Sequence, residues 1–450
     1  MCSVEEDIED ISKYSKRVGN RNASEYRNLQ ECKKCDMKSE VLLQKKDPFC
    51  RKCFFEYCSH KFRSTIGKSK QIKHGDKVLL ACSGGRKSTA LLHMTKKTLD
   101  FATAKQISFN AEIIFIDESL VFPTVEDKQQ QIQNIINELK SYGYPVLCSS
   151  LEMICKLNSN QIFFWNCDTI DSIKDFPSCS DSQNCIKECM EDMSLSAKLD
   201  FIKHIRLLLI TEIANHAGFK HVFVGDTSCS LAENLLNNIS LGRGSQISSA
   251  TNFSDFRYKV SICRPLREFL NKEIGLYIHL HDCSYFVLPN LLTKTDTKSC
   301  IQRLTESFIV NLQKDFPATV FTIFRTGGKL LKQNELPETE ICLLCRSKLD
   351  NLHPNACSAL EALKLSEQLS QISINDTLVD TVSTENEGGL SDLNDFEDMN
   401  FFRFLCYGCS IPFRKNKKSC TFNPVLKTQY VKMTRNEMKE DIKDFLISKE

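Results

Sequence analysis

An alternation of short apolar runs with helical segments, which begins at Lys77, constrains the fold of this 450-residue chain more than any other feature. Stretches with helical periodicity, such as STALLHMTKKTLDFA and VEDKQQQIQNIINELKSYG, separate the runs KVLLACS, AEIIFIDE, PVLCSSL and HVFVGDTS. Strands that alternate with helices in this way form right-handed βαβ units. The sequence therefore predicts an α/β protein built on a doubly wound parallel sheet.

A glycine-rich turn follows the first of these runs. Two glycines between a strand and a helix let backbone N–H groups surround an anion, and the helix N-terminus adds partial positive charge. A loop that uses ATP also has to manage Mg²⁺, which prefers carboxylate oxygens, but the middle of this loop carries Arg86 and Lys87. The alternative is an ordinary strand-to-helix turn. The residues of the nucleotide-type loop are Ser83, Gly84, Gly85, Lys87 and Ser88.

Other polar residues end the neighbouring strands. Asp117 closes the second run, and Gly225 and Asp226 close a later one. Ligands of open parallel sheets bind at the carboxyl ends of the strands, so these residues are expected on one rim with the glycine loop. Asp117 is a candidate for a ribose or a metal ion, or equally a helix cap.

Two matched cysteine pairs precede the α/β segment. CKKC and CRKC have the spacing C-x2-C, fourteen residues, C-x2-C, and such pairs can place four thiolates at the corners of a tetrahedron. Four unrelated buried thiols are the alternative. The predicted metal ligands are Cys32, Cys35, Cys50 and Cys53.

A second set of pairs, CLLC and CYGC, lies far downstream, with an acidic stretch between them. The entropic cost of closing that long loop grows only slowly with its length, so the two pairs can share a second metal site. Two independent structural turns are the alternative. Structural zinc is the default metal for both sets, and an iron–sulfur cluster is not excluded. The remaining cysteines are expected to be scattered thiols, not disulfides. The second set is Cys342, Cys345, Cys406 and Cys409.

Charge is distributed unevenly, although the formal net charge is only +2. Residues 33–87 contain 15 Lys and Arg against 5 Asp and Glu, whereas residues 371–400 contain 8 acids and no Lys or Arg. A basic linker beside a cysteine ribbon favours RNA binding through the backbone, and a solvated linker or helix face is the alternative. The candidate RNA-binding residues are Lys61, Arg63, Lys68, Lys70, Lys73, Arg264 and Arg267.

These patterns divide the chain. We expect a mobile leader over residues 1–30, a ribbon over 31–60, an α/β domain over 61–340 with an insertion near 156–193, C-terminal cysteine pairs over 341–410 with a flexible acidic loop near 360–400, and a tail over 411–450. The acidic N-terminus lacks the apolar core of a signal peptide, and no apolar run approaches the roughly 18 residues of a membrane span. A soluble, cytoplasmic protein is expected.

The motifs together resemble the cytoplasmic tRNA 2-thiolation protein family, and within it the second subunit. The segments that carry the resemblance include HKFRSTIGK, GDKVLLACSGGRKSTALL, LGRG, RPLREFLNKE and RLTESFIVNLQKDFPATVFTIFRTGGKL, and the match extends from about Cys32 to Cys409. The resemblance implies the PP-loop (adenine nucleotide α-hydrolase-like) fold. It also implies a role in 2-thiolation of the wobble uridine (U34) of the tRNAs for lysine, glutamate and glutamine.

In that family the partner is the first thiolation subunit, which forms a heterodimer with the second. The sulfur arrives as a thiocarboxylate on a ubiquitin-like carrier, and ATP activates the uridine oxygen before sulfur displaces AMP.

This sequence departs from the active members at the catalytic positions. Active PP-loop enzymes resemble one another in Ser-Gly-Gly-x-Asp-Ser, and Lys87 replaces that aspartate. The Gly-His-x-x-Asp-Asp turn is matched here by GDTSCS from Gly225. Of the two catalytic cysteines of thiolating relatives, only the second has a loose counterpart, Cys283.

Three hypotheses follow. The leading one is a non-catalytic or weakly catalytic subunit that binds tRNA and stabilises its partner, with ATP and Mg²⁺ used in the complex. The second is a self-sufficient ATP-dependent sulfurtransferase in which Lys87 contacts phosphate and a cysteine carries sulfur. The third is a zinc-ribbon adaptor that binds only proteins.

Overall fold

The computed structural model describes residues 31–43, 47–101, 107–121, 128–156, 164–167, 180–244, 247–293, 295–330, 341–349 and 404–414. The chain divides into two compact units, residues 1–333 and 334–450. The predicted leader (1–30), the acidic loop (360–400) and most of the predicted tail (415–450) lie outside the described residues.

The first unit opens with the antiparallel strands β1 (Val41–Leu43) and β2 (Asp47–Phe49), which lead into helix α3 (Arg51–Ser69). Residues at four-residue spacing form one buried stripe along α3, as expected for a helix that packs on a core. They are Phe54, Cys58, Phe62 and Ile66. The expected basic linker is therefore helical as far as Ser69.

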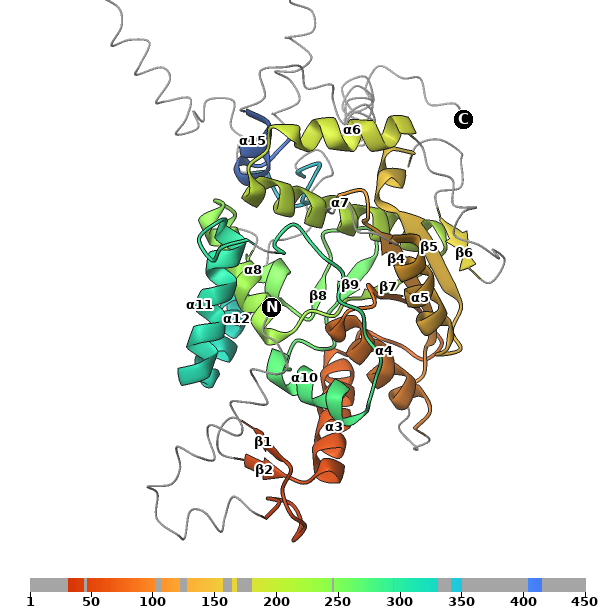
Figure 1. Ribbon diagram of the computed structural model, residues 1–450, viewed down its shortest axis with the longest axis vertical. Helices are drawn as coiled ribbons and strands as arrows, with labels where there is room; N and C mark the ends of the chain where they lie inside the picture. The colour runs from red at the N-terminus through yellow and green to blue at the C-terminus, as the bar shows by residue number, and fades with distance from the viewer. Residues whose placement is uncertain are drawn as a thin grey trace, which may run out of the picture. The chain divides into compact units, whose positions relative to one another are not determined.

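Among the described residues, seven strands form one sheet in the order β6-β5-β4-β3-β7-β9-β8 (Figure 1). The five inner strands are parallel, and the edge strands β6 and β8 run antiparallel to their neighbours. This confirms the predicted parallel α/β sheet. The strands are β3 (Lys77–Ala81), β4 (Asn110–Asp117), β5 (Val146–Ser150), β6 (Trp165–Asn166), β7 (His221–Phe223), β8 (Ser254–Asp255) and β9 (Ser261–Cys263).

Strand β3 occupies the centre of the sheet, and the strand order reverses there. The chain adds β4 and β5 on one side of β3, and then returns to add β7 and β9 on the other. The turns after β3 and β7 therefore meet at the topological switch point, where open α/β sheets bind ligands.

Helices connect the strands and cover the sheet. The core on one face joins α3, α4, α5 and α10 to alternate strand residues, such as Val78 and Leu80 of β3, and α7 packs against β4 and β7. The helices are α4 (Arg86–Leu99), α5 (Lys128–Lys140), the 3-10 helix η2 (Leu151–Lys156), α6 (Ser180–Glu191), α7 (Leu195–His216), α8 (Ser228–Ser240), α9 (Ile247–Thr251), α10 (Asn271–Leu280), α11 (Ile301–Asp315) and α12 (Pro317–Lys329).

The sequence also predicts helices over RPLREFLNKEIGLYIHL, from Arg264, and over KSCIQRLTESFIVNLQKDF, from Lys298, and both differ in their bounds. The helix expected from Arg264 begins only at Asn271, because the backbone N–H of Leu270 donates to the Glu273 carboxylate at 2.9 Å and starts the helix there. The helix expected from Lys298 ends at Asp315, and a second helix starts at Pro317, whose fixed φ suits the first helical position.

The described part of the second unit contains helix α15 (Tyr407–Arg414) and the residues around the C-terminal cysteine pairs. An isolated antiparallel bridge joins Ile341 to Lys348, which makes a tight turn around Cys342 and Cys345.

Candidate functional site

The glycine loop has the backbone of an anion-binding turn. Gly84 has a φ of +75°, and a Cβ at this position would lie 2.9 Å from Cγ2 of Ile135 on α5. Both the left-handed backbone and the close approach require glycine. Gly85 is the N-cap of α4 and supplies no side-chain hydrogen bond, so the first N–H groups of the helix have no side-chain cap.

Two serines lie against this loop. The Ser88 hydroxyl donates to the Gly85 carbonyl at 2.9 Å, and the hydroxyl oxygens of Ser83 and Ser88 are 3.4 Å apart. The loop thus keeps the shape that the sequence predicts for a phosphate site.

Lys87 is directed into the protein. Its Nζ donates to Oγ of Ser230 at 2.6 Å, in the first turn of α8. That hydroxyl lies 3.1 Å from Oγ1 of Thr227, the N-cap of α8. Lys87 therefore links the N-termini of α4 and α8.

The turn after β7 touches the glycine loop, as the switch point requires. A Cβ on Gly225 would lie 3.2 Å from the carbonyl carbon of Lys87, so only glycine fits comfortably. On α8, burial raises the pKa of Glu233 to about 7, while Lys87 acts in the opposite direction. Lys87 thus favours the charged form of Glu233, against the larger effect of burial.

Neither candidate aspartate is free of internal contacts. The Asp117 carboxylate accepts hydrogen bonds from the backbone N–H of Ser119 at 2.8 Å and from its hydroxyl at 3.1 Å. Burial raises the pKa of Asp117, against the effect of these hydrogen bonds. Asp226 lies 3.4 Å from Nε of Arg264. Both residues lie on the rim of the sheet, as the sequence predicts.

The predicted RNA-binding cations fall into two groups. Lys61 pairs with the buried Glu273 at 2.9 Å, and the buried Arg264 donates to the Asn252 carbonyl at 2.9 Å and to Asp255 at 3.2 Å. Arg63 lies 4.2 Å from the Phe101 ring centroid and Arg267 5.3 Å from that of Phe324. Lys61, Arg264 and Arg267 thus contact groups of the fold, and Arg63 lies against the exposed Phe101 ring, whereas the exposed cations are Lys68, Lys70 and Lys73.

Cys283 lies just beyond α10. Its backbone N–H donates to the Ile278 carbonyl at 3.1 Å, and its side chain lines a pocket with Arg86 of the glycine loop. Burial raises the pKa of this thiol.

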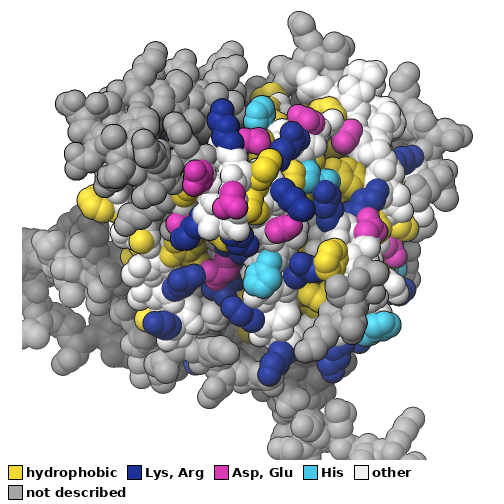
Figure 2. Space-filling view, turned by 90° about the horizontal axis from the view of Figure 1, so that it is seen from below, with side chains coloured by type: hydrophobic (Ala, Val, Ile, Leu, Met, Phe, Trp, Pro, Cys, Tyr) yellow, Lys and Arg dark blue, Asp and Glu magenta, His cyan; other side chains and the backbone are white. Residues whose placement is uncertain are grey.

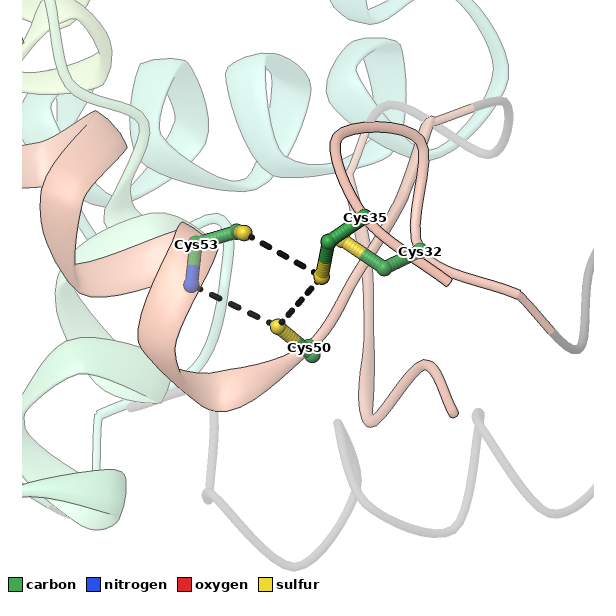
Figure 3. A group of neighbouring side chains, drawn as sticks. All are labelled: Cys32, Cys35, Cys50 and Cys53. Carbon is green, nitrogen blue, oxygen red and sulfur yellow. Dashed lines mark hydrogen bonds between the residues drawn. The ribbon is translucent and has the colours of Figure 1, made fainter. Parts of the chain in front are cut away.

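The four N-terminal cysteines come together (Figure 3). Their sulfur atoms all lie within 4.8 Å of one another, and Cys35 Sγ is 3.6 Å from the sulfur atoms of both Cys50 and Cys53. One pair comes from the turn before β1 and the other from the N-terminus of α3.

The thiols of this group differ in acidity. Burial acts to raise the pKa of Cys32, but backbone hydrogen bonds, among them that of Lys34, outweigh it and lower the pKa to about 6. Burial and the neighbouring sulfur atoms raise the pKa of Cys53 to about 12. A cation among the four is needed before all of them ionise, which is the behaviour of a metal site.

The four C-terminal cysteines also converge within 4.8 Å, with Cys345 and Cys406 sulfur atoms 3.6 Å apart. All four are fully buried. The Leu343 N–H donates to the Phe404 carbonyl at 3.0 Å and joins the two segments. Four thiolates suit a structural zinc ion or an iron–sulfur cluster, so both groups can hold metal, as the spacing predicts.

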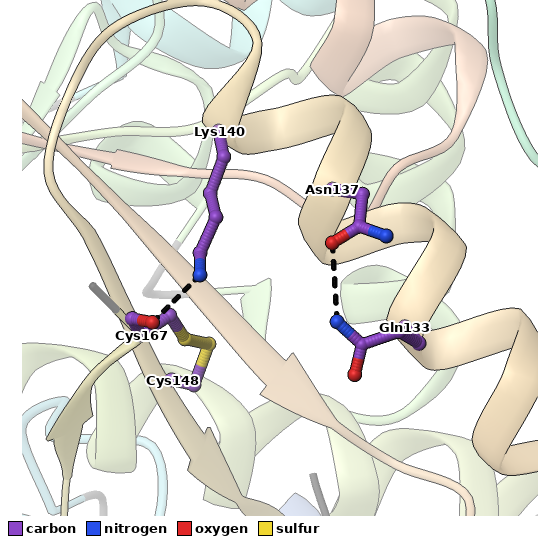
Figure 4. The surroundings of a disulfide bond; sticks show 5 residues. All are labelled: Gln133, Asn137, Lys140, Cys148 and Cys167. Atoms are coloured by element: carbon purple, nitrogen blue, oxygen red, sulfur yellow. Dashed lines mark hydrogen bonds between the residues drawn. A yellow bond between two sulfur atoms is a disulfide. The ribbon is translucent and has the colours of Figure 1, made fainter. Parts of the chain in front are cut away.

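A disulfide at the edge of the sheet was not predicted from the sequence. Cys148 and Cys167 form a disulfide between β5 and the residue after β6, although scattered thiols were expected (Figure 4). Lys140 of α5 donates to the Cys167 carbonyl at 2.7 Å. Nothing in the irregular spacing of these cysteines indicates the pairing, which depends on the antiparallel edge strand.

Comparisons with known proteins support the fold and the motifs. The family model "Cytoplasmic tRNA 2-thiolation protein 2" matches residues 300–411. The Danio rerio protein of that name is 31% identical over the full length of both chains, and the Xenopus tropicalis protein is 33% identical over 93% of this chain and 94% of its own.

Among solved structures, the U34-tRNA thiolase NcsA from Methanococcus maripaludis, determined with its [4Fe-4S] cluster, superposes with a TM-score of 0.50 at 18% identity. The match covers 70% of this chain and 90% of NcsA, and confirms the PP-loop type of α/β fold.

None of the helices in the described part of the chain has both the length and the apolar character needed to cross a membrane. The full-length match to relatives above 30% identity establishes the family. The chain belongs to the cytoplasmic tRNA 2-thiolation protein 2 family.

Proposed function

We propose that this chain is the non-catalytic or weakly catalytic subunit of a cytoplasmic heterodimer that 2-thiolates U34 in the tRNAs for lysine, glutamate and glutamine. A role in tRNA 2-thiolation follows from its family. The first thiolation subunit is the proposed partner and the source of adenylation. A ubiquitin-like carrier supplies sulfur as a thiocarboxylate.

One observation carries the assignment of roles: the loop keeps its glycine geometry, but Lys87 replaces the acid and is bound to Ser230. Adenylation by a PP-loop needs a carboxylate to manage Mg²⁺ while backbone N–H groups stabilise the departing pyrophosphate. This chain retains the N–H groups and lacks the carboxylate at that position. It is therefore suited to support a catalytic partner.

Reconstitution tests the proposal. The chain, the first subunit, or both are incubated with Mg·ATP, substrate tRNA and thiocarboxylated carrier, and 2-thiouridine and AMP are measured. We expect the heterodimer to thiolate tRNA and this chain alone to produce neither product. Thiolation and AMP release by this chain alone, at the rate of the complex, would establish the self-sufficient sulfurtransferase.

Cys283 provides a second comparison within that assay. If this chain only supports its partner, Cys283→Ala in the heterodimer leaves thiolation within about twofold of the wild type. Loss of thiolation with unchanged tRNA affinity would instead make Cys283 a sulfur carrier.

For RNA contact we propose the exposed residues Lys68, Lys70 and Lys73, since Lys61, Arg63, Arg264 and Arg267 already contact side chains or backbone of this chain. Each phosphate contact contributes a slope of about 0.9 to the dependence of log affinity on log salt concentration. The triple alanine variant is expected to lower that slope. A chain that does not bind tRNA would support the protein-only adaptor.

We further propose that both four-cysteine groups hold structural zinc. Element analysis of the purified chain is expected to find two zinc ions per chain. An absorption band near 400 nm, with iron and sulfide in matching amounts, would show that one of the groups holds an iron–sulfur cluster instead of zinc.

A further inference from the structure

A pocket of about 290 Å³ opens beside the glycine loop, on the side of α10. Its volume is at the lower end of the range for small-molecule sites, about 300–1,000 Å³, and suits one ring system better than a whole nucleoside triphosphate. The lining residues are Arg86, Gly275, Ile278, His279, Cys283 and Tyr285, with Asp282 at the end of α10.

The segment that closes this pocket, residues 282–287, is anchored at both ends. Asp282 has a φ of +50° and turns the chain out of α10. The Phe286 N–H donates to the Gly84 carbonyl at 2.9 Å, which fastens the segment to the glycine loop. The pocket is therefore a built feature beside the switch point of the sheet.

Two groups that stack on nucleobases line the pocket. Tyr285 is 36% exposed, and the Arg86 guanidinium lies 5.9 Å from the centroid of its ring. Aromatic rings and arginine planes are the surfaces on which proteins stack the unpaired bases of RNA.

A second set of rings lies where α3 meets α10. Phe55 stacks on His281 at 3.7 Å between centroids, with an angle of 15° between the planes. His93 and Tyr277 are 4.7 and 4.5 Å from His281. Burial, with help from Lys97, lowers the pKa of His93 to about 4 and that of His281 to about 3. At neutral pH these histidines are therefore uncharged, and with Tyr277 almost fully buried the cluster packs on itself and supports the wall of α10 beside the pocket.

Cations lie beside both sets of rings. Arg51 and Lys97 are exposed; the Arg51 guanidinium lies 5.8 Å from the centroid of the Phe55 ring, and both cations act on His281. The one acid of the pocket, Asp282, lies 3.9 Å from Arg51, which offsets its charge. Figure 2, which views the molecule from its lower end in Figure 1, shows Lys and Arg side chains, with Asp and Glu between them, among His and hydrophobic ones. Basic groups interleaved with rings fit a polyanion with planar groups.

We propose that this pocket binds one unstacked base of single-stranded RNA, with Tyr285 as the stacking platform and the neighbouring cations on the adjacent phosphates. The inference rests on the proposed function, because it assigns a place for tRNA on this subunit. An acidic peptide would use the cations and leave the rings unused, so RNA matches more of the surface.

The test uses the full-length chain, a fluorescein-labelled single-stranded U-rich 12-mer RNA and the same sequence as a duplex, at one fixed salt concentration. We expect the single strand to bind more tightly than the duplex. Tyr285→Ala is expected to weaken single-strand binding about five- to a hundredfold, the usual loss for one stacked base. Tyr285→Phe keeps the ring and should bind as the wild type does.

The control variant is Phe256→Ala, which removes an exposed ring (67% exposed) from the turn after β8. It should leave RNA affinity unchanged. A 12-mer with 5-iodouridine should crosslink to the peptide that contains residues 282–287, and free UMP at millimolar concentration should compete only weakly, because it lacks the neighbouring phosphates.

Equal affinity of Tyr285→Ala and wild type, or crosslinks confined to other peptides, would overturn the inference and leave the proposed thiolation role standing. Competition by UMP as strong as by the RNA would reassign the pocket to a free nucleotide. If the heterodimer thiolates tRNA only with this chain present, and Tyr285→Ala weakens tRNA binding, both proposals hold.

Discussion

The two groups of four cysteines contain the same donors but are closed in different ways. In the N-terminal group the pairs are close in sequence, with Cys35 and Cys50 separated by 15 positions, and Cys35 remains half-exposed. In the C-terminal group Cys345 and Cys406 are separated by 61 positions, and all four thiols are fully buried. The first group shapes a local turn on a helix that has its own core. The second joins distant segments, so more structure depends on it.

The largest effect is therefore expected from Cys406→Ser. Structural zinc contributes about 10–16 kcal/mol of apparent binding free energy in small domains, and losing one thiolate removes much of it. The variant should lose one metal ion per chain. Proteolysis of the second unit should be at least about tenfold faster, because its two described segments are no longer joined.

Cys300→Ser is the matched control. Cys300 is buried and is the N-cap of α11, where its sulfur accepts from Arg303 N at 3.4 Å. Serine is a preferred N-cap, so stability should change by less than about 0.5 kcal/mol and metal content should not change. Unchanged metal content in Cys406→Ser would show that the C-terminal pairs are independent turns.

A smaller effect is expected from Cys35→Ser in the N-terminal group. One metal ion should again be lost, but α3 stays packed through the fully buried Phe54 and Phe62. The thermal midpoint of the first unit should fall by only about 2–4 °C, equivalent to about 1 kcal/mol for a domain of this size. Calorimetry and metal analysis measure both quantities.

Cys58→Ser is the comparison variant for Cys35→Ser, because it should lower stability without loss of the metal ion. Its thiol is fully buried in α3 and lies outside the four-cysteine group. We expect intact metal content and a stability loss of about 1–3 kcal/mol, since a hydroxyl replaces a buried thiol. If Cys35→Ser lowered stability more than Cys58→Ser, the N-terminal group would be as important to its unit as the C-terminal one.

The contrast between local and distant contacts also explains what the sequence could predict. The C-x2-C pairs and the parallel sheet were predictable because adjacent residues or a repeating pattern encode them. Arg264 and Lys61 look like free cations in the sequence, since their partners Asp255 and Glu273 are recognisable only in the folded chain. The contact of Arg86 with Tyr285 and the Cys148–Cys167 disulfide likewise depend on how the strands and helices pack.

Metal removal by a chelator should separate the two groups in time. Cys35 is accessible without unfolding, whereas the C-terminal thiols require local opening of the second unit. With an excess of a zinc-binding colorimetric indicator as the chelator, we expect two phases of colour change that differ in rate on the order of tenfold. Cys35→Ser should lack the fast phase and Cys406→Ser the slow one. A single phase in the wild type would mean that burial does not control release.

The smallest effect is expected at the ion pair that spans the N-terminal turn. Lys33 Nζ lies 2.5 Å from the Asp47 carboxylate, and the Lys33 N–H donates to the Pro48 carbonyl at 2.8 Å. Because both side chains are exposed, Lys33→Ala should cost no more than about 1 kcal/mol and accelerate the fast chelation phase about two- to fivefold. At 1 M salt the difference should disappear, since the Debye length falls to about 3 Å.

Lys34→Ala, which removes an exposed lysine that has no ion pair among the described residues, is the control. Equal acceleration of the fast phase by both variants would mean that net charge, and not the Lys33–Asp47 ion pair, controls metal release from the N-terminal group.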